Sequence, residues 1–183
     1  MARSVFFSFH YERDIWRVNT VRNHFVTRGG YNQAGYWDHS LWEEAKKDGE
    51  LALKRLINKG LQDTSVTVVL IGAETAQRGW VNYEIEKSYK RGNGMLGIYI
   101  HNIGNREGQK DYRGANPFDN FRVVEKKREI VFLSDIKPMS AIYPTYDWVA
   151  DNGYNNFSTW VENAAKAAGK WTFLIKSHNH QSV

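Results

Sequence analysis

Residues 65–100, SVTVVLIGAETAQRGWVNYEIEKSYKRGNGMLGIYI, decide the fold of this chain. The stretch opens on an almost continuous apolar run, which is typical of a strand covered on both faces in a parallel sheet, and Gly72 ends that run. Val81, Ile85 and Tyr89 then recur at four-residue spacing and predict a helix with one apolar stripe. Glycines end the helix and a second apolar run follows, so the stretch predicts a strand-helix-strand unit.

Glu84 is the residue of this unit that can carry chemistry. It lies one helical turn after Trp80, near the start of the predicted helix. In a parallel sheet, ligands bind beyond the carboxyl ends of the strands, where the loop after Ile71 and the start of the next helix lie. The other interpretation is an ordinary solvated carboxylate, stabilised by the positive end of the helix. These residues alone leave both interpretations open.

Strands and helices alternate along the rest of the chain. Hydrophobic strands are predicted at residues 5–9 and 129–133, and apolar stripes predict helices at 15–25, 53–61 and 157–168. This alternation predicts an α/β fold built as a three-layer sandwich. With right-handed crossovers and the first strand in the middle of the sheet, the predicted topology is flavodoxin-like, with a mainly parallel five-stranded sheet of order 2-1-3-4-5.

Length and composition predict one cytoplasmic domain. In this chain of 183 residues, 1–175 are predicted to form a single domain and 176–183 a polar tail. The apolar fraction of 42% and the aromatic fraction of 14% exclude a disordered chain. No apolar run reaches the roughly 18–20 residues of a membrane span, and the N-terminal apolar run is too short for a signal peptide. The absence of cysteine fits a cytoplasmic protein.

Charge and short motifs argue against several other classes of site. The formal charge is +5, but the basic residues are scattered and the densest run is only Lys126, Lys127 and Arg128, so nucleic-acid binding is not favoured. His178 and His180 lie in the polar tail without further ligands, so no metal site is predicted. Neither a glycine-rich dinucleotide fingerprint nor a phosphate-binding Gly-Lys-Ser/Thr loop occurs in the sequence.

Four stretches of the chain together resemble a TIR-like domain. They are VFFSFHYERD at 5–14, GYWDHSLWEE at 35–44, the stretch from 64 to 100, and YDWVADNGYNNFSTWVENA at 146–164. More narrowly, they resemble the TIR-like proteins of the bacterial Thoeris anti-phage system. The resemblance extends over residues 3–168, and it implies that the predicted single domain is TIR-like.

The resemblance implies an enzyme that breaks the bond between nicotinamide and ribose in NAD⁺. The pattern Trp80-x-x-x-Glu84 matches the place where enzymatic TIR domains carry their catalytic glutamate. The chemistry suits one carboxylate, because the cationic pyridinium departs as neutral nicotinamide and needs no acid. The remaining demand is to stabilise an oxocarbenium-like ribose. On this interpretation Glu84 is catalytic, NAD⁺ is the substrate, and no further cofactor is required.

Five more residues are candidates for binding the nucleotide. Ser8 and Phe9 lie at the end of the first strand, where a hydroxyl and main-chain N–H groups could hold ribose or phosphate. Trp42 and Asp38 belong to an aromatic loop that could stack on a base and meet a hydroxyl or the pyridinium charge. Trp80 is expected as a ring wall of the pocket. The structural alternatives stay open. They are a core aromatic and a strand-end turn at the end of the first strand, and packing of the aromatic loop against the sheet.

The resemblance also implies partners. In Thoeris-like systems the product is a cyclic ADP-ribose isomer or a related nucleotide, made on phage infection and sensed by an effector protein. A phage-derived activator, an effector reached through the diffusible product, and TIR self-association are therefore expected. The alternative is a non-catalytic TIR interaction module. A flavodoxin-like flavin binder is disfavoured because no phosphate-binding loop follows the first strand.

Overall fold

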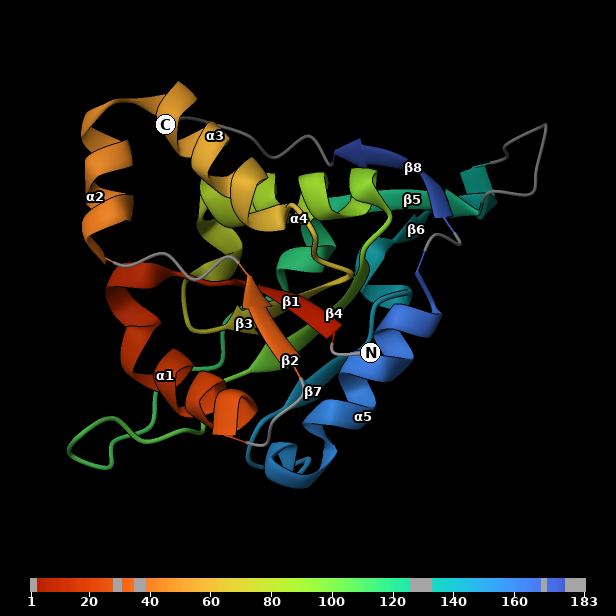
Figure 1. Cartoon of the computed structure of the whole chain (residues 1–183). Coiled ribbons are helices and arrows are strands. Elements are labelled where there is room, and N and C mark those ends of the chain that lie inside the picture. Colours follow the sequence, from red (N-terminus) through yellow and green to blue (C-terminus); the bar gives the residue numbers. More distant parts are fainter. Residues whose placement is uncertain (1–2, 28–30, 35–38, 126–132, 169–170, 177–183) are drawn as a thin grey trace.

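The computed structural model describes residues 3–27, 31–34, 39–125, 133–168 and 171–176 (Figure 1). Within these residues a five-stranded parallel sheet has the order β2-β1-β3-β4-β7. Its strands are β1 (Arg3–Ser8), β2 (Tyr31–Ala34), β3 (Val66–Ile71), β4 (Gly94–Tyr99) and β7 (Thr145–Asp147). The prediction of an α/β fold with a parallel sheet flanked by helices is confirmed, and the arrangement is compatible with a flavodoxin-like fold.

Helices cover both faces of this sheet. Helix α1 (Tyr11–Thr27) and helix α5 (Gly153–Lys166) pack on one face, and α3 (Glu50–Leu61) and α4 (Gly79–Arg91) pack on the other. Helix α2 (His39–Lys47) packs against α3. Among the described residues, no helix has both the length and the apolar character that crossing a membrane requires.

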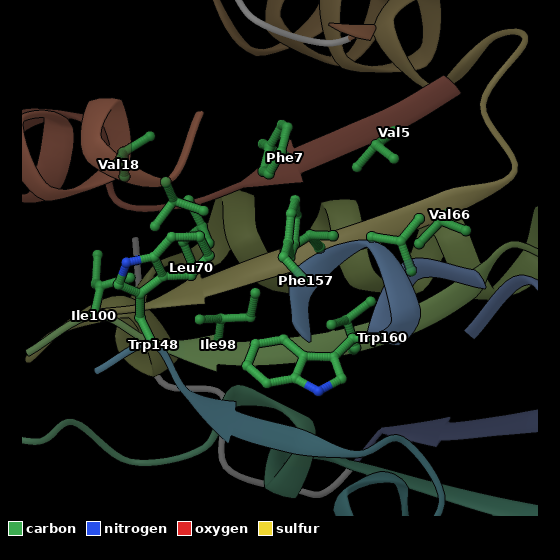
Figure 2. Packing of buried hydrophobic residues seen from close by; sticks show 14 of the residues in the cluster. Val5, Phe7, Val18, Val66, Leu70, Ile98, Ile100, Trp148, Phe157 and Trp160 are labelled. Atoms are coloured by element: carbon green, nitrogen blue, oxygen red, sulfur yellow. The ribbon is translucent and has the colours of Figure 1, made fainter. Parts of the chain in front are cut away.

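Figure 2 shows the cluster of buried hydrophobic residues on the α1 and α5 face. Val5 and Phe7 of β1 point into it, together with Val66, Val68 and Leu70 of β3. Aromatic rings of α5 close this layer, with the rings of Phe7 and Phe157 stacked at 6.2 Å between centroids. Side chains alternate along a strand, so Phe6 and Ser8 of β1 point to the opposite face, toward α3 and α4.

Strand β3 and helix α4 follow the sequence prediction closely. All six residues of β3 are buried, as expected for a strand covered on both faces. The helix ends where Gly92 takes a left-handed conformation, with φ of 79°, and its N–H group bonds back to the Tyr89 carbonyl. The predicted parallel pairing of the first strand with the strand of residues 65–71 is confirmed, since β1 pairs with β3 in register Phe6 to Thr67.

A second, antiparallel sheet lies beside the first and was not expected from the sequence. It contains β5 (Phe121–Glu125), β6 (Lys137–Pro138) and β8 (Trp171–Lys176) in the order β6-β5-β8. The predicted strand at 129–133 lies outside the described residues, except Leu133, which begins a short 3-10 helix. The predicted tail, 176–183, also lies outside them apart from Lys176. The 3-10 helices are Thr75–Gln77, Pro117–Asn120, Leu133–Asp135 and Met139–Ala141.

Candidate active site

A buried carboxyl group and a buried hydroxyl group meet where β1 ends. Ser8 is the last residue of β1, and its Oγ donates a hydrogen bond of 2.5 Å to Oε2 of Glu84 on α4. Ser8 is fully buried and Glu84 is 5% exposed. The interpretation of Glu84 as a solvated helix carboxylate is therefore wrong. The residues that meet are 76 positions apart in sequence, and the parallel pairing of β1 with β3 brings them together.

Burial controls the acidity of Glu84. Removal of the side chain from water raises the pKa of Glu84 to about 8, and the hydrogen bond from Ser8 opposes that shift only in part. Among the described residues, Ser8 is the one hydrogen-bond donor to this carboxyl group. The group is therefore mostly protonated at neutral pH in the free protein. A ligand that places positive charge beside it would favour the carboxylate form.

The position of Glu84 on its helix explains its burial. The buried residues of α4 are Val81, Asn82, Glu84, Ile85, Ser88 and Tyr89. Glu84 and Ser88 are four residues apart and lie beside the predicted apolar stripe, so both fall within the arc that faces the sheet. The sequence therefore contained an indication that Glu84 is buried, because Glu84 falls within the arc of α4 that faces the sheet. The apolar stripe of Val81, Ile85 and Tyr89 alone does not require that burial.

Trp42 and Trp80 form an aromatic region on the same side of the sheet as Glu84. Both side chains are partly buried and pack, with Tyr83, against a cluster of Phe6, Ile57 and Leu61. The rings of Trp80 and Tyr83 meet edge to face at 6.0 Å. Since Phe6 and Ser8 share one face of β1, this region lies on the side of the sheet that carries Ser8 and Glu84. The partly exposed indole rings leave aromatic surface available to a ligand.

The structure does not bring the Phe9 side chain together with Glu84. Phe9 follows β1 directly, and its ring packs against the core on the α1 and α5 face and lies 5.8 Å from the ring of Tyr11. That is the opposite face from Ser8, as the alternation of side chains requires. Any contact of Phe9 with a ligand near Glu84 therefore involves its backbone. The remaining predicted residue, Asp38, lies outside the described residues.

An ion-pair network that the sequence did not predict occupies another part of the same sheet edge. Arg13 of α1 donates two hydrogen bonds to Asp111, at 2.9 and 3.2 Å, and one of 3.2 Å to Glu74. Arg78 also pairs with Glu74. Arg17 is buried, lies 3.7 Å from Asp111, and donates to the backbone carbonyl of residue 103 at 2.9 Å. This network joins α1 to the loops that follow β3 and β4.

Two backbone segments approach one another closely beneath this network. A Cβ atom on Gly114 would lie 2.0 Å from the carbonyl oxygen of Gly72, so the loop after β4 packs directly on the end of β3. A Cβ atom on Gly72 would lie 2.2 Å from Oδ2 of Asp14. Asp14 is fully buried, and burial raises its pKa to about 6. Lack of space against backbone atoms thus requires glycine at position 114, whereas a side chain at position 72 would displace the Asp14 carboxyl group. No short motif could reveal these contacts.

No metal site is formed by the part of the chain that the structure describes: it contains no group of three or more His, Asp and Glu side chains placed to hold an ion. His10, just beyond β1, lies 4.0 Å from Glu74, and burial is the main cause of a pKa below the usual histidine value. Around Glu84, the described residues offer one buried carboxyl group, one hydroxyl group and nearby aromatic rings.

Comparison with known proteins agrees with the resemblance seen in the sequence. Residues 6–105 match the family described as "Thoeris protein ThsB, TIR-like domain". A protein of Bacillus cereus (strain MSX-D12), named "Putative cyclic ADP-D-ribose synthase ThsB1", is 44% identical over 191 residues. That alignment covers 88% of this chain and 100% of the relative. The predicted membership in this group of TIR-like proteins is confirmed.

Proposed function

The chain belongs to the Thoeris ThsB family of TIR-like domains, and from this premise we propose that it cleaves NAD⁺ and makes a cyclic ADP-ribose-type signalling nucleotide. The observation that carries the proposal is the buried pair of Ser8 and Glu84 at the carboxyl edge of the parallel sheet. The name of the Bacillus cereus relative, which specifies a cyclic ADP-D-ribose synthase, supports the class of reaction.

In the proposed reaction, the bond between C1′ of ribose and the nicotinamide nitrogen breaks, and its electron pair leaves with neutral nicotinamide. Positive charge develops on the ribose at C1′. The carboxylate of Glu84 stabilises that charge electrostatically, and the effect is strong because the group is shielded from water. A lone pair on an acceptor atom of the same nucleotide then forms the new bond to C1′ and closes the ring.

The protonation of Glu84 fits this sequence of events. With the site empty, burial keeps the carboxyl group largely neutral, since its pKa lies at about 8. The cationic nicotinamide ring favours loss of that proton when NAD⁺ binds, so the negative charge is created where the substrate needs it. Enzymes widely use burial in this way to shift the pKa of a catalytic group.

The other predicted residues take supporting roles in this proposal. Ser8 holds the Glu84 carboxyl group in the free protein, and in this proposal its hydroxyl turns to a ribose hydroxyl when NAD⁺ binds. Trp42 and Trp80 offer ring faces on which nicotinamide or adenine stacks. We keep Asp38 as a proposed contact to a hydroxyl or the pyridinium ring, and Phe9 as a contact through its backbone. NAD⁺ is the substrate, and no other cofactor enters the proposal.

The biological setting of the proposal is phage defence in the cytoplasm. A phage-derived signal activates the enzyme, the nucleotide product diffuses, and an effector protein responds to it. Self-association of TIR domains accompanies activation. The alternative is a TIR module that only assembles with other TIR domains. The burial of Glu84 with a single hydroxyl partner, beside partly exposed indole rings, favours the enzyme, because carboxyl groups of raised pKa are concentrated at functional sites.

The proposal is tested by replacing Glu84 with glutamine. Glu84→Gln keeps the shape and can still accept from Ser8, but it is neutral at every pH and cannot oppose a developing cation. Loss of such an electrostatic partner commonly costs on the order of 10²–10³ in rate, so product in phage-challenged cells should fall to near background. Nucleotides are measured by chromatography with mass spectrometry, at matched protein levels and with unchallenged cells beside them.

Glu86→Gln is the matched control for this experiment. Glu86 lies on the same helix, has the same side chain, and accepts a hydrogen bond of 2.6 Å from the exposed Lys90. We expect this variant to keep product formation. Product from Glu84→Gln at the parent level would exclude Glu84 as the catalytic residue and favour another catalytic site, whereas absence of product from the parent itself would favour the assembly module.

A further inference from the structure

A chain of buried hydroxyl groups leads from the sheet to the backbone of Glu84. Oγ1 of Thr67, on β3, lies 2.8 Å from Oγ of Ser88, and Oγ of Ser88 lies 2.7 Å from the Glu84 carbonyl oxygen. Thr67 and Ser88 are both fully buried. A carbonyl oxygen only accepts, so Ser88 must use its single proton on Glu84. Thr67 is therefore the donor in its bond to Ser88, and the direction of the chain is fixed.

Asn93 starts this chain and a second branch. Its Nδ2 donates to Oγ1 of Thr67 at 3.3 Å and to Oγ1 of Thr64 at 2.9 Å. Thr64 in turn donates a hydrogen bond of 2.8 Å to the carbonyl oxygen of Leu61, and Leu61 is the last residue of α3. One branch thus reaches the backbone of Glu84 on α4, and the other reaches only the end of α3. The two branches share Asn93 as donor but end at different helices.

The composition of β3 makes Thr67 conspicuous. The strand reads VTVVLI, so Thr67 is its single polar residue, and every residue of the strand is buried. A buried hydroxyl group is unfavourable unless it is hydrogen-bonded, whereas valine would fit the same strand without that requirement. The bond from Ser88 to the carbonyl four residues earlier is common in helices, but the bond that it accepts from Thr67 ties the helix to the sheet.

Two attachments therefore fix Glu84 to neighbouring strands. Its carboxyl group bonds to Ser8 on β1, and its backbone is held through Ser88 by Thr67 on β3. Strands β1 and β3 are joined by their own ladder, in which Phe6 lies opposite Thr67 and Ser8 opposite Val69. The backbone attachment does not depend on the carboxyl group. It persists when the carboxyl group leaves Ser8 to face a ligand.

We infer that Thr67 and Ser88 are positioning residues for Glu84, which hold its backbone in place while its carboxyl group exchanges the bond to Ser8 for contact with the substrate. This inference rests on the proposed function of Glu84. The hydroxyl groups touch no ligand and act only through Glu84. Misplacement of a reacting group by about 1 Å can cost about 10²-fold in rate, so a looser backbone at Glu84 has a measurable effect.

The test compares isosteric changes on the two branches of the network. Thr67→Val removes the attachment of α4, leaves Asn93 its bond to Thr64, and leaves Ser88 its bond to Glu84. Thr64→Val removes a buried hydroxyl group from the same Asn93 but leaves the attachment of α4 intact. Ser88→Ala removes the attachment by a second route, and Thr67→Ser restores the hydroxyl group. All are compared in the full chain, beside the parent and Glu84→Gln.

Two readouts separate positioning from stability. The first is nucleotide product in phage-challenged cells, divided by the amount of folded protein. We expect a fall of roughly tenfold in Thr67→Val and Ser88→Ala, less than about twofold in Thr64→Val, and recovery in Thr67→Ser. The second is the ¹³C carboxyl NMR titration of Glu84 in labelled protein, assigned by the signal lost in Glu84→Gln. Its midpoint should shift in Thr67→Val and stay at the parent value in Thr64→Val.

The outcomes also separate the inference from the proposed function. Equal product per folded protein in Thr67→Val and Thr64→Val, with unmoved titration midpoints, would show that the network only stabilises the core. If Glu84→Gln abolishes product while Thr67→Val keeps it, the positioning inference fails and the proposed function stands. If Glu84→Gln keeps product, Glu84 is not the catalytic residue and the positioning inference fails with it, and the titration still reports whether Thr67 sets the surroundings of Glu84.

Discussion

Glu84 and Asp111 are carboxyl groups at the same edge of one sheet, and their surroundings are opposite. Glu84 is buried beside a single hydroxyl donor, and its pKa is raised to about 8. Burial also opposes the ionisation of Asp111, but hydrogen bonds from Arg13 and from the Tyr112 N–H, with the charges of Arg13 and Arg17, outweigh it and lower the pKa. Asp111 has its acceptor capacity filled by the protein, whereas Glu84 has capacity left for a ligand.

The contrast separates a structural carboxylate from a candidate reactive one. Asp111 joins α1 to the loop after β4, and any ligand would have to compete with two arginines for its oxygens. Glu84 gives up only one bond when it turns to a ligand. A buried acid with so few partners destabilises the fold when it ionises. A catalytic role therefore explains the burial of Glu84 better than a structural role does.

The largest effect expected from this contrast is on the pH dependence of stability. The pKa of Glu84 is about 8 in the folded protein and near 4.5 in the unfolded chain. The contribution of Glu84 to the free energy of unfolding is therefore fully present below pH 4.5 and is lost as pH rises through 8. Glu84→Gln should therefore gain stability relative to the parent across this window, by at most about 1.4 kcal/mol per pH unit. Urea unfolding of both proteins at pH 5, 7 and 8.5 measures the difference, and a difference independent of pH would contradict it.

Asp111→Asn should have the next largest effect, and it should act in the opposite direction. The change removes the carboxylate that pairs with the buried Arg17 and with Arg13, although Arg13 keeps its bond to Glu74, so the free energy of unfolding should fall by about 1–3 kcal/mol at pH 7. The pKa of folded Asp111 is lowered, so this contribution exists above the unfolded value of 3.8 and is lost as pH falls below it. Product per folded protein should stay near the parent level.

Denaturant unfolding at pH 7 and at about pH 2.5, below the unfolded pKa of Asp111, checks the Asp111 prediction, with nucleotide product measured on the same variant. A variant as stable as the parent at pH 7 would mean that the arginines find other partners. A large loss of product per folded protein would mean that this part of the sheet edge belongs to the active site, and the contrast with Glu84 would then disappear.

Ser8→Ala should give the smallest of the three effects. The hydroxyl group of Ser8 lowers the pKa of Glu84 against the effect of burial, so its removal should raise that pKa further, by up to about one unit for a bond worth roughly 1 kcal/mol. Carboxyl ¹³C NMR of labelled protein follows the titration. An unchanged midpoint would indicate that water takes the place of the hydroxyl group, and Ser8 would then not control the acidity of Glu84.

The sequence predicted those parts of the molecule that repeat a pattern locally. Strand β3, the helix with Val81, Ile85 and Tyr89, and the following strand are each encoded within a few residues, and the parallel pairing of β1 with β3 follows from the α/β alternation. The fold class was predictable for that reason. The TIR resemblance identified Glu84, but the bond of its carboxyl group to Ser8 spans 76 positions, and no local pattern records that contact.

Other features could not be predicted, for separate physical reasons. The run VFFSF is apolar on both faces, so nothing in it shows that Phe9 faces α1 and α5 whereas Ser8 faces α4. Strand β7 is only three residues long and too short to show a period. The second sheet pairs β5 with β8 across about fifty residues, and the bond from Arg13 to Asp111 spans 98 positions. Such contacts depend on the completed fold.

The place of β1 in the sheet has a consequence for synthesis of the chain. β1 lies between β2 and β3, and β3 follows it by about sixty residues in the sequence. At roughly 5–20 residues per second, a ribosome needs about 3–12 seconds to make that interval. Until β3 has been synthesised, one edge of β1 is unpaired, and the apolar side chains of Val5, Phe6 and Phe7 lack their native contacts with β3. Chaperone capture of nascent chains should therefore concentrate on this strand until residue 71 has left the exit tunnel.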